Sequence, residues 1–115
     1  MTPPAVKVEN LSDALRALQS NASSGQPVYL VFSWASLRSA GIGYAMAIVA
    51  KARATHPQIA CLSVLDAGED VGLALSALKA GADKVLFSGA PALAQKLGQI
   101  AGQLGVRLEV IPTAA

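Results

Sequence analysis

Residues 28–32 read Val-Tyr-Leu-Val-Phe, an apolar run of strand length without a polar interruption. A strand with one face in water alternates polar and apolar residues, whereas an unbroken apolar run is typical of a parallel strand that is covered on both faces. The sequence therefore predicts a central strand of a parallel sheet over these residues.

Four more strand-like segments accompany this run along the chain. We expect strands over residues 5–9, 59–65, 84–87 and 107–111. Apolar residues at helical spacing, with cap residues and glycines at the ends, predict about four helices between them, over 11–18, 41–56, 71–80 and 91–104. Residues 33–43, which follow the central strand, are expected to form a longer loop.

The regular alternation of strand and helix predicts a single α/β domain over residues 1–115. Parallel strands joined by right-handed crossovers favour an open, doubly wound, mostly parallel five-stranded sheet with helices on both faces, a flavodoxin-like three-layer sandwich. Five strands are too few for a closed barrel. The sequence leaves the strand order open.

Charged residues are scarce, at 14% of the chain against roughly 25% in ordinary soluble domains. A small globule with so few charges exposes apolar surface, and extended apolar patches mark interaction sites. We therefore expect a homo-oligomer or a complex with another protein. The helix over residues 41–54 is the favoured surface, because its alanines and Ile48 extend the apolar stripe beyond one face.

Several classes of partner are disfavoured by composition. No apolar run reaches the ~18–20 residues of a membrane span, and the Met-Thr-Pro-Pro start lacks a signal core, so we expect a cytoplasmic protein that binds no membrane. A net charge of +2 and 4% aromatic residues argue against nucleic acid. The lone Cys61 predicts a small buried hydrophobe, not a disulfide.

Short motifs over about residues 28–102 resemble the receiver domain of response regulators. The helix after the central strand ends in Ala-Thr-His-Pro-Gln-Ile (54–59), much as receivers end theirs. Cys-Leu-Ser-Val-Leu-Asp-Ala (61–67) lies where receivers carry a strand that closes in a hydroxyl residue and alanine. Ala-Leu-Lys-Ala-Gly-Ala-Asp (77–83) resembles the helix end before their last strand. The resemblance implies a receiver-like fold.

The functional residues of receivers do not carry over. The phosphoacceptor aspartate falls on Ser33, the switch hydroxyl on Asp66 and the conserved lysine on Ser88. Near the position of the acidic pair that binds magnesium, the chain offers only Glu9 and Asn10. A serine cannot replace an aspartyl-phosphate nucleophile, and no metal would neutralise the phosphoryl group. The resemblance therefore implies a domain without phosphoacceptor chemistry.

Ligands of open α/β sheets bind where the strands end at their carboxyl termini. The segment Ser33–Gly43 is the best equipped, since it contains the only tryptophan, Trp34, and Arg38. Arg38 with free backbone amides could hold an anion, while Trp34 could cover an apolar part of a ligand. A structural interpretation is also open, in which Trp34 packs over the sheet edge.

Two further loops follow strand ends. Ser88-Gly89 precedes a helix that starts at Pro91, where free amides could hold a phosphate or carboxylate, or simply form a turn. Residues 66–70 concentrate three acids, which predict either a metal or base site or helix capping. The predicted ligand-binding residues are Ser33, Trp34, Arg38, Asp66, Ser88 and Gly89.

No catalytic triad, zinc set or phosphate-binding loop is present in the sequence, and we expect no cofactor and no metal. The leading hypothesis is a non-catalytic protein-interaction or assembly module. The alternative is a small-ligand protein or enzyme subunit that binds an anion, nucleotide or metabolite at the strand-end loops, in which case the ligand is expected between residues 33–43 and 88–91.

Overall fold

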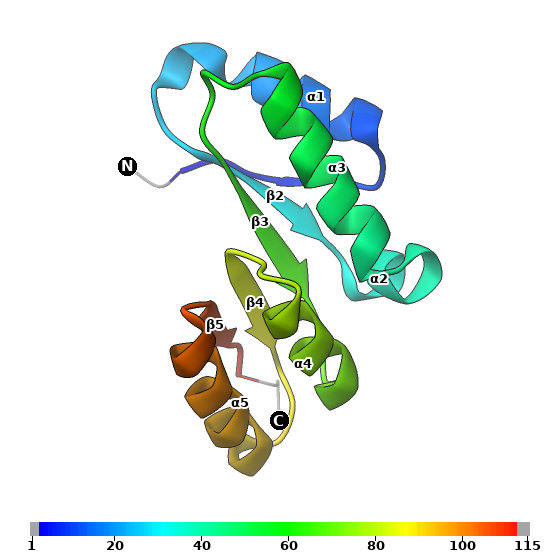
Figure 1. Ribbon diagram of the computed structural model, residues 1–115, viewed down its shortest axis with the longest axis vertical. Coiled ribbons are helices and arrows are strands. Elements are labelled where there is room, and N and C mark those ends of the chain that lie inside the picture. The colour runs from blue at the N-terminus through cyan, green and yellow to red at the C-terminus, as the bar shows by residue number, and fades with distance from the viewer. Residues whose placement is uncertain (1–2, 113–115) are drawn as a thin grey trace.

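The computed structural model describes residues 3–112 and contains a five-stranded, all-parallel sheet with five α-helices (Figure 1). The predicted α/β class and open parallel sheet are confirmed. In chain order the elements are β1 (Ala5–Lys7), α1 (Leu11–Ser20), a 3-10 turn η1 (Ala22–Ser24), β2 (Val28–Phe32), α2 (Trp34–Ala40), α3 (Ile42–Thr55), β3 (Cys61–Asp66), α4 (Val71–Lys79), β4 (Lys84–Phe87), α5 (Pro91–Leu104) and β5 (Arg107–Val110).

Short polar side chains fix where three helices begin. The side chains of Asn10, Ser33 and Asp70 each accept the backbone N–H of the third residue onward, at 2.8, 3.2 and 2.9 Å. Such caps satisfy amides that have no partner inside the helix. Pro91 occupies the first turn of α5, and Gly105 ends that helix with a φ of 70°.

The segment predicted as a loop over residues 33–43 is mostly helical, which corrects the prediction. Ser33 caps α2, the sequence has no glycine or proline between 34 and 40, and Leu37 is 2% exposed in the core. Gly41, with a φ of 94°, then turns the chain from α2 into α3. That left-handed backbone is readily adopted by glycine, which has no Cβ to clash.

The five strands lie in consecutive order, β1-β2-β3-β4-β5. Flavodoxin-like sheets have the order 2-1-3-4-5, in which a reversal sends helices to both faces. Here every crossover steps in the same direction, and right-handed crossovers that never reverse place all helices on one face. Consecutive parallel strands with helices on one side form the repeating unit of βα-barrels.

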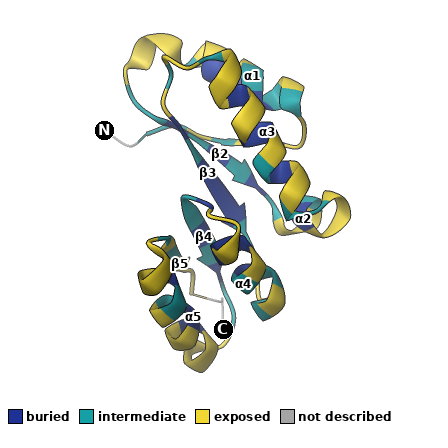
Figure 2. Cartoon of the chain, viewed as in Figure 1, coloured by how far each residue is buried: buried dark blue, intermediate teal, exposed yellow. Residues whose placement is uncertain are grey.

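Burial differs between the two faces of the sheet. Val28, Leu30 and Phe32 of β2 are at most 2% exposed, and their register partners in β3 share the same face, which we call the helix-covered face. The alternate residues are only half-buried except at the centre and lie outside the main hydrophobic core. We call this second surface the open face. Its centre is formed by Tyr29, Val31, Leu62, Val64 and Leu86, and the register places charged residues around them: Lys7, Asp66, Lys84, Arg107 and Glu109. Figure 2 shows this mixture of buried and intermediate residues along the strands.

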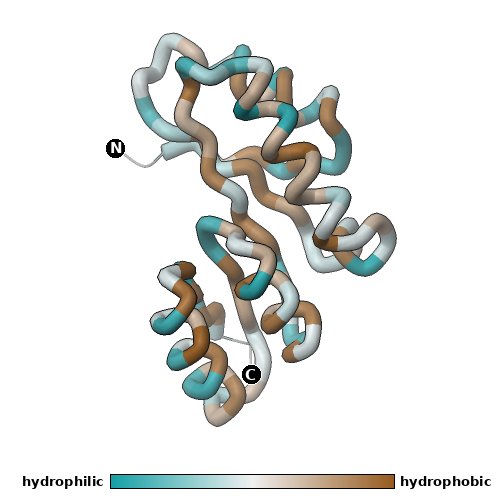
Figure 3. The backbone as a smooth tube through the Cα atoms, viewed as in Figure 1, coloured by the Kyte–Doolittle hydropathy of each residue, from teal (hydrophilic) through white to brown (hydrophobic). Residues whose placement is uncertain are grey.

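The centre of the open face is apolar although it carries no helix layer. Apolar colour predominates along β2 and β3 in Figure 3, and on this face the hydrophilic Asp66 comes only at the end of β3. Only Val64, at the centre, is 4% exposed. The apolar sequence of these strands therefore predicts a cover on both faces of the sheet, whereas the described chain covers only one.

The α3 surface is less apolar than expected. Ile48 is 5% exposed and belongs to the core, so it does not extend an outward stripe. The outward residues of α3 are mainly alanines, charged residues and Tyr44, which is 47% exposed. Within residues 3–112, no helix is long and apolar enough to cross a membrane.

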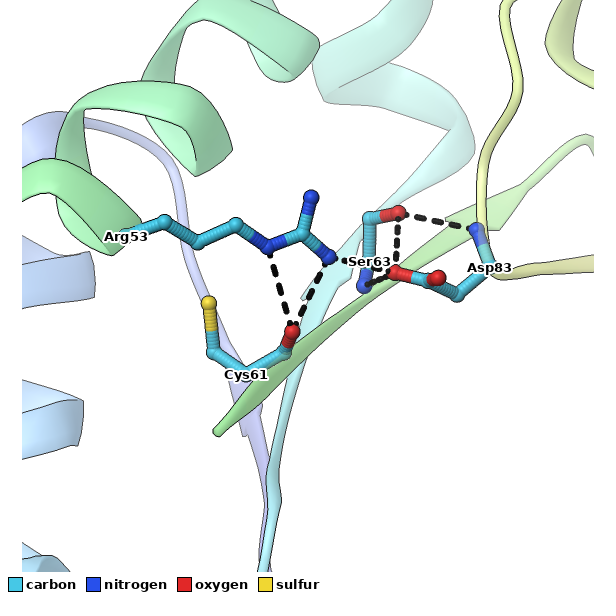
Figure 4. Close-up of polar contacts among 4 residues, drawn as sticks. All are labelled: Arg53, Cys61, Ser63 and Asp83. Atoms are coloured by element: carbon cyan, nitrogen blue, oxygen red, sulfur yellow. Dashed lines mark hydrogen bonds and ion pairs between the residues drawn. The ribbon is translucent and has the colours of Figure 1, made fainter. Parts of the chain in front are cut away.

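A polar network joins β3 to the turn before β4, at the amino ends of the strands (Figure 4). Arg53 of α3 donates to the carbonyl oxygen of Cys61 through Nε at 3.3 Å and Nη2 at 3.0 Å. The same Nη2 donates to Asp83 Oδ2 at 2.8 Å. This network ties α3 to the sheet at the end opposite the candidate site.

Candidate functional site

A cleft of about 900 Å³ opens at the carboxyl ends of β3 and β4. Four residues predicted from the sequence to bind a ligand line it together: Trp34, Arg38, Asp66 and Ser88. Loops at this end of a parallel sheet converge because all strands point the same way. The remaining lining residues are Gly68, Glu69, Asp70, Ile111 and Pro112.

Backbone hydrogen bonds hold the loops of the cleft together. Ala67 donates its N–H to Leu86 at 2.9 Å, and Ser88 donates to Gly68 at 2.8 Å. Ile111 continues the pattern by donating to Phe87 at 2.8 Å. The strand ladder thus extends into the loops, which gives the cleft a fixed floor.

Trp34 forms one wall of the cleft and lies over Gly68. A Cβ added to Gly68 would lie 3.1 Å from Trp34 Cδ1, and the φ of Gly68 is +58°. Both the close approach and the left-handed backbone favour glycine at this position. Trp34 remains 43% exposed, so its ring presents apolar surface to the cleft.

Arg38 is already engaged by neighbouring groups. Its Nη1 lies 3.6 Å from Asp70 Oδ2, and its guanidinium carbon lies 5.2 Å from the centre of the Trp34 ring. The Arg38 side chain is 59% exposed, so water weakens both contacts. These contacts hold Arg38 against the α2 side of the cleft.

The carboxylates of the cleft also have structural partners. Asp66 Oδ1 accepts the N–H of Gly68 at 2.9 Å and shapes the loop, and Asp70 caps α4. With Glu69 the lining holds three carboxylates against one guanidinium. Among residues 3–112, no group of three His, Cys, Asp or Glu side chains could hold a metal ion. This charge balance disfavours the predicted anion, because like charges would repel it.

Ser33 and Gly89 lie outside the cleft lining. Ser33 serves as the cap of α2. Gly89 lines an adjoining hollow with Pro91 and Val110, and a Cβ there would lie 2.4 Å from Phe87 Cζ. Gly89 therefore makes room for the buried Phe87 ring, which is the turn interpretation of this segment.

Sequence reasoning missed Ile111 and Pro112 in the cleft wall. Both follow the last strand at its carboxyl end, so the rule that selected the other loops also applies to them. Ile111 is 37% exposed and adds an apolar patch beside Ser88. The exposure of Ile111 could not be foreseen, because the sequence predicts it as the last residue of a strand over residues 107–111.

Comparison with known proteins yields a fold relationship only. No family model matches the chain, and neither does any curated protein. Among solved structures, the chain is similar to a protein from Coccidioides immitis assigned as a fructose-1,6-biphosphate aldolase, with a TM-score of 0.79 and 16% sequence identity. The match covers 95% of this chain and 45% of the aldolase chain. The chain thus spans less than half of that larger protein.

Proposed function

We propose that this protein is a non-catalytic assembly module whose binding surface is the open face of its sheet. The observation that carries the proposal is the half-buried state of apolar side chains on central strands, such as Val31, Leu62 and Leu86. All-parallel sheets occur almost only with both faces covered. A chain that leaves one face bare is therefore suited to being covered by a partner.

The energetics favour such a partner. Full burial of one large apolar side chain gains about 1.5–3 kcal/mol. Covering the exposed half of the four half-buried residues Tyr29, Val31, Leu62 and Leu86 would gain on the order of 3–6 kcal/mol before the costs of association. Lys84, which pairs with Glu109 and lies 5.9 Å from the Tyr29 ring centre, supplies part of a charged rim. An apolar centre with a polar rim is typical of protein interfaces.

The roles of the polar groups in the cleft support the non-catalytic part of the proposal. Asp66 and Asp70 accept backbone amides, and Arg38 is paired with Asp70. Asp66 and Asp70 are half-buried, and Arg38 is exposed. Their positions are accounted for by loop shape and helix capping.

Photo-crosslinking tests the interaction surface. A photoreactive benzoyl-phenylalanine replaces Leu86 on the open face, and in a matched control it replaces Leu104, which is 48% exposed on α5. In the cells that make the protein, irradiation is expected to give a discrete protein adduct from position 86 and none from position 104. Absence of any adduct from position 86 would reject the proposed function.

The second candidate is small-ligand binding in the cleft, favoured by the convergence of Trp34, Arg38, Asp66 and Ser88 in one hollow. A thermal-shift panel of phosphates, nucleotides, carboxylates and amines tests it. A stabilising ligand should lose its effect in Trp34→Ala, while the helix-surface variant Leu93→Ala should keep it. A flat response across the panel removes the support for this candidate.

A further inference from the structure

We infer that the open face is covered by a second copy of this chain, and that the two copies close their sheets into one ten-stranded barrel. The inference rests on the proposed function and names its partner. Two structural relationships carry it: the stagger of the strands across the sheet, and the state of the two edge strands.

The starting points of the strands shift toward the carboxyl ends once across the sheet, between β3 and β4. β3 begins opposite the first residue of β2, whereas β4 begins opposite Val64, three residues into β3. β5 starts level with β4, since Arg107 pairs with Lys84. A shift of register of this kind is part of the shear that a sheet needs in order to close into a barrel. Five strands alone cannot close, but two sets of five can.

Both ends of the sheet are unpaired edges in the part of the chain that the structure describes. β1 pairs only with β2, and β5 pairs only with β4. Edge strands expose backbone N–H and C=O groups, which favour pairing with another strand. A two-fold axis along the barrel places β5 of each copy beside β1 of the other in parallel, like every pair within the sheet.

The offset of the partner's β1 against β5 decides which residues meet. If β1 of the partner sits about two residues above β5, its Ala5–Lys7 segment lies beside Glu109–Ile111. Val110 and Ile111, exposed by 48% and 37%, would then be covered by the partner's β1. Lys7 of the partner subunit would also approach Glu109, an opposite charge within diagonal reach. A flush closure, with Ala5 beside Arg107, would place Lys7 of the partner subunit directly opposite Glu109, so both registers bring these opposite charges together.

A stable interface needs more area than the open face provides, and burying the two strand edges together with that face supplies the difference. A five-stranded face spans about 24 Å by 15 Å at ordinary strand spacing, or roughly 350 Å² in projection. A stable interface needs about 800 Å² from each partner, so the face alone is too small. Closure adds two strand edges and the loops around them. The aldolase match shows this fold within a chain of about twice the size.

Edge variants separate this arrangement from other modes of association. Val8 donates its N–H to Val31, and Pro4 accepts from Tyr29, so alternation points the Lys7 amide away from β2. Lys7→Pro therefore removes an edge donor and leaves the β1–β2 ladder intact, since edge strands tolerate proline. Leu62→Glu places a charge on the open face, and Leu104→Glu does the same on the helix surface.

Sedimentation velocity of the purified full chain, from about 1 to 300 μM, gives the test. The expected result is twice the chain mass of 11.7 kDa for the wild type and for Leu104→Glu. Lys7→Pro removes one donor at each of the two seams and should raise the dimer dissociation constant about thirtyfold, the equivalent of two hydrogen bonds, and Leu62→Glu should raise it about a hundredfold. Circular dichroism confirms that each variant is folded.

Three outcomes overturn the inference. One is a wild-type monomer at every concentration, another is a dimer that Lys7→Pro does not weaken, and the third is a dimer broken by Leu104→Glu. The crosslinking at position 86 keeps this test separate from the proposed function. A monomeric chain that still forms a cellular adduct at Leu86 refutes the second copy and leaves the assembly role standing.

Discussion

Ser63 and Asp83 are joined by three reciprocal hydrogen bonds. Asp83 Oδ2 accepts both the N–H and the hydroxyl of Ser63, at 2.7 and 3.0 Å, while Ser63 Oγ accepts the N–H of Asp83 at 2.9 Å. Ser63 is fully buried on the helix-covered face, the one polar residue of the described chain that is buried. The carboxylate of Asp83 thus replaces the missing start of the β3–β4 ladder, whose registered pairs begin only at Val64.

Asp83→Ala is expected to lower the free energy of unfolding by about 2–3 kcal/mol. The substitution leaves the buried N–H and hydroxyl of Ser63 without an acceptor and also releases Arg53. Glu69→Ala, on the exposed loop of the cleft, is the control and should change stability by less than about 0.5 kcal/mol. Urea denaturation measures both, and equal effects would contradict the structural role of Asp83.

Gly89→Ala is expected to destabilise the fold by about 1–3 kcal/mol. The new methyl group would lie 2.4 Å from Phe87 Cζ, and Phe87 is fully buried with no room to retreat. The matched substitution Gly98→Ala lies inside α5, where a Cβ meets nothing within 4 Å. It should instead stabilise by about 0.5–1 kcal/mol, the helix preference of alanine over glycine. Thermal denaturation of the two variants should therefore give shifts of opposite sign.

Ionisation of the Cys61 thiol makes the stability of the protein depend on pH in the alkaline range. Burial raises the pKa of its thiol above the ordinary value of 9.0, an effect that the nearby Arg53 partly offsets. The unfolded thiol therefore ionises at a lower pH than the folded one. The free energy of unfolding contributed by this group is complete below pH 9 and is lost as the pH rises through the folded pKa.

The measurement compares the slope of stability with pH between about 8 and 10.5 in the wild type and in Cys61→Ala. The variant lacks the thiol, so its slope should be shallower in this range, whatever the tyrosines and lysines contribute in both proteins. Identical slopes would mean that the thiol ionises equally in both states.

No acyl-phosphate is expected when the protein is incubated with acetyl phosphate. Ser33, at the position that would correspond to the phosphoacceptor, accepts the N–H of Ser36 as a helix cap. Asp66 lies at the end of the neighbouring strand β3, and its Oδ1 accepts the N–H of Gly68. Intact-mass spectrometry should show an unchanged chain mass. An adduct of 80 Da, the mass of one phosphoryl group, that hydroxylamine removes would support receiver-like chemistry instead.

The apolar run over residues 28–32 shows which structural features a local sequence pattern can predict. It predicts β2 at its observed bounds, and it also predicts a cover on both faces. In the chain alone, Tyr29 and Val31 are only half-buried, so the pattern describes an environment that one copy of the chain does not supply. Strand order could not be read in the same way, because every order of parallel strands uses the same alternation of apolar segments.

Part of the lining of the candidate cleft could be predicted from the sequence, and the reason is physical. Trp34, Arg38, Asp66 and Ser88 could be grouped because parallel strands send their carboxyl ends to one edge. The engagement of Arg38 with Asp70 could not be foreseen, since it depends on α2 being a helix where a loop was expected. Gly89 was chosen for its turn chemistry, but the packing of Phe87 beneath it decides its identity.

The consecutive order of the strands has a consequence for how the chain acquires its structure. Each strand pairs only with the strand before it and the strand after it along the polypeptide, so every contact in the sheet closes a modest loop. Folding rates rise as the sequence separation of contacts falls. During synthesis, each new strand leaves the ribosome when its neighbour is already made, so the sheet can grow in the order of translation.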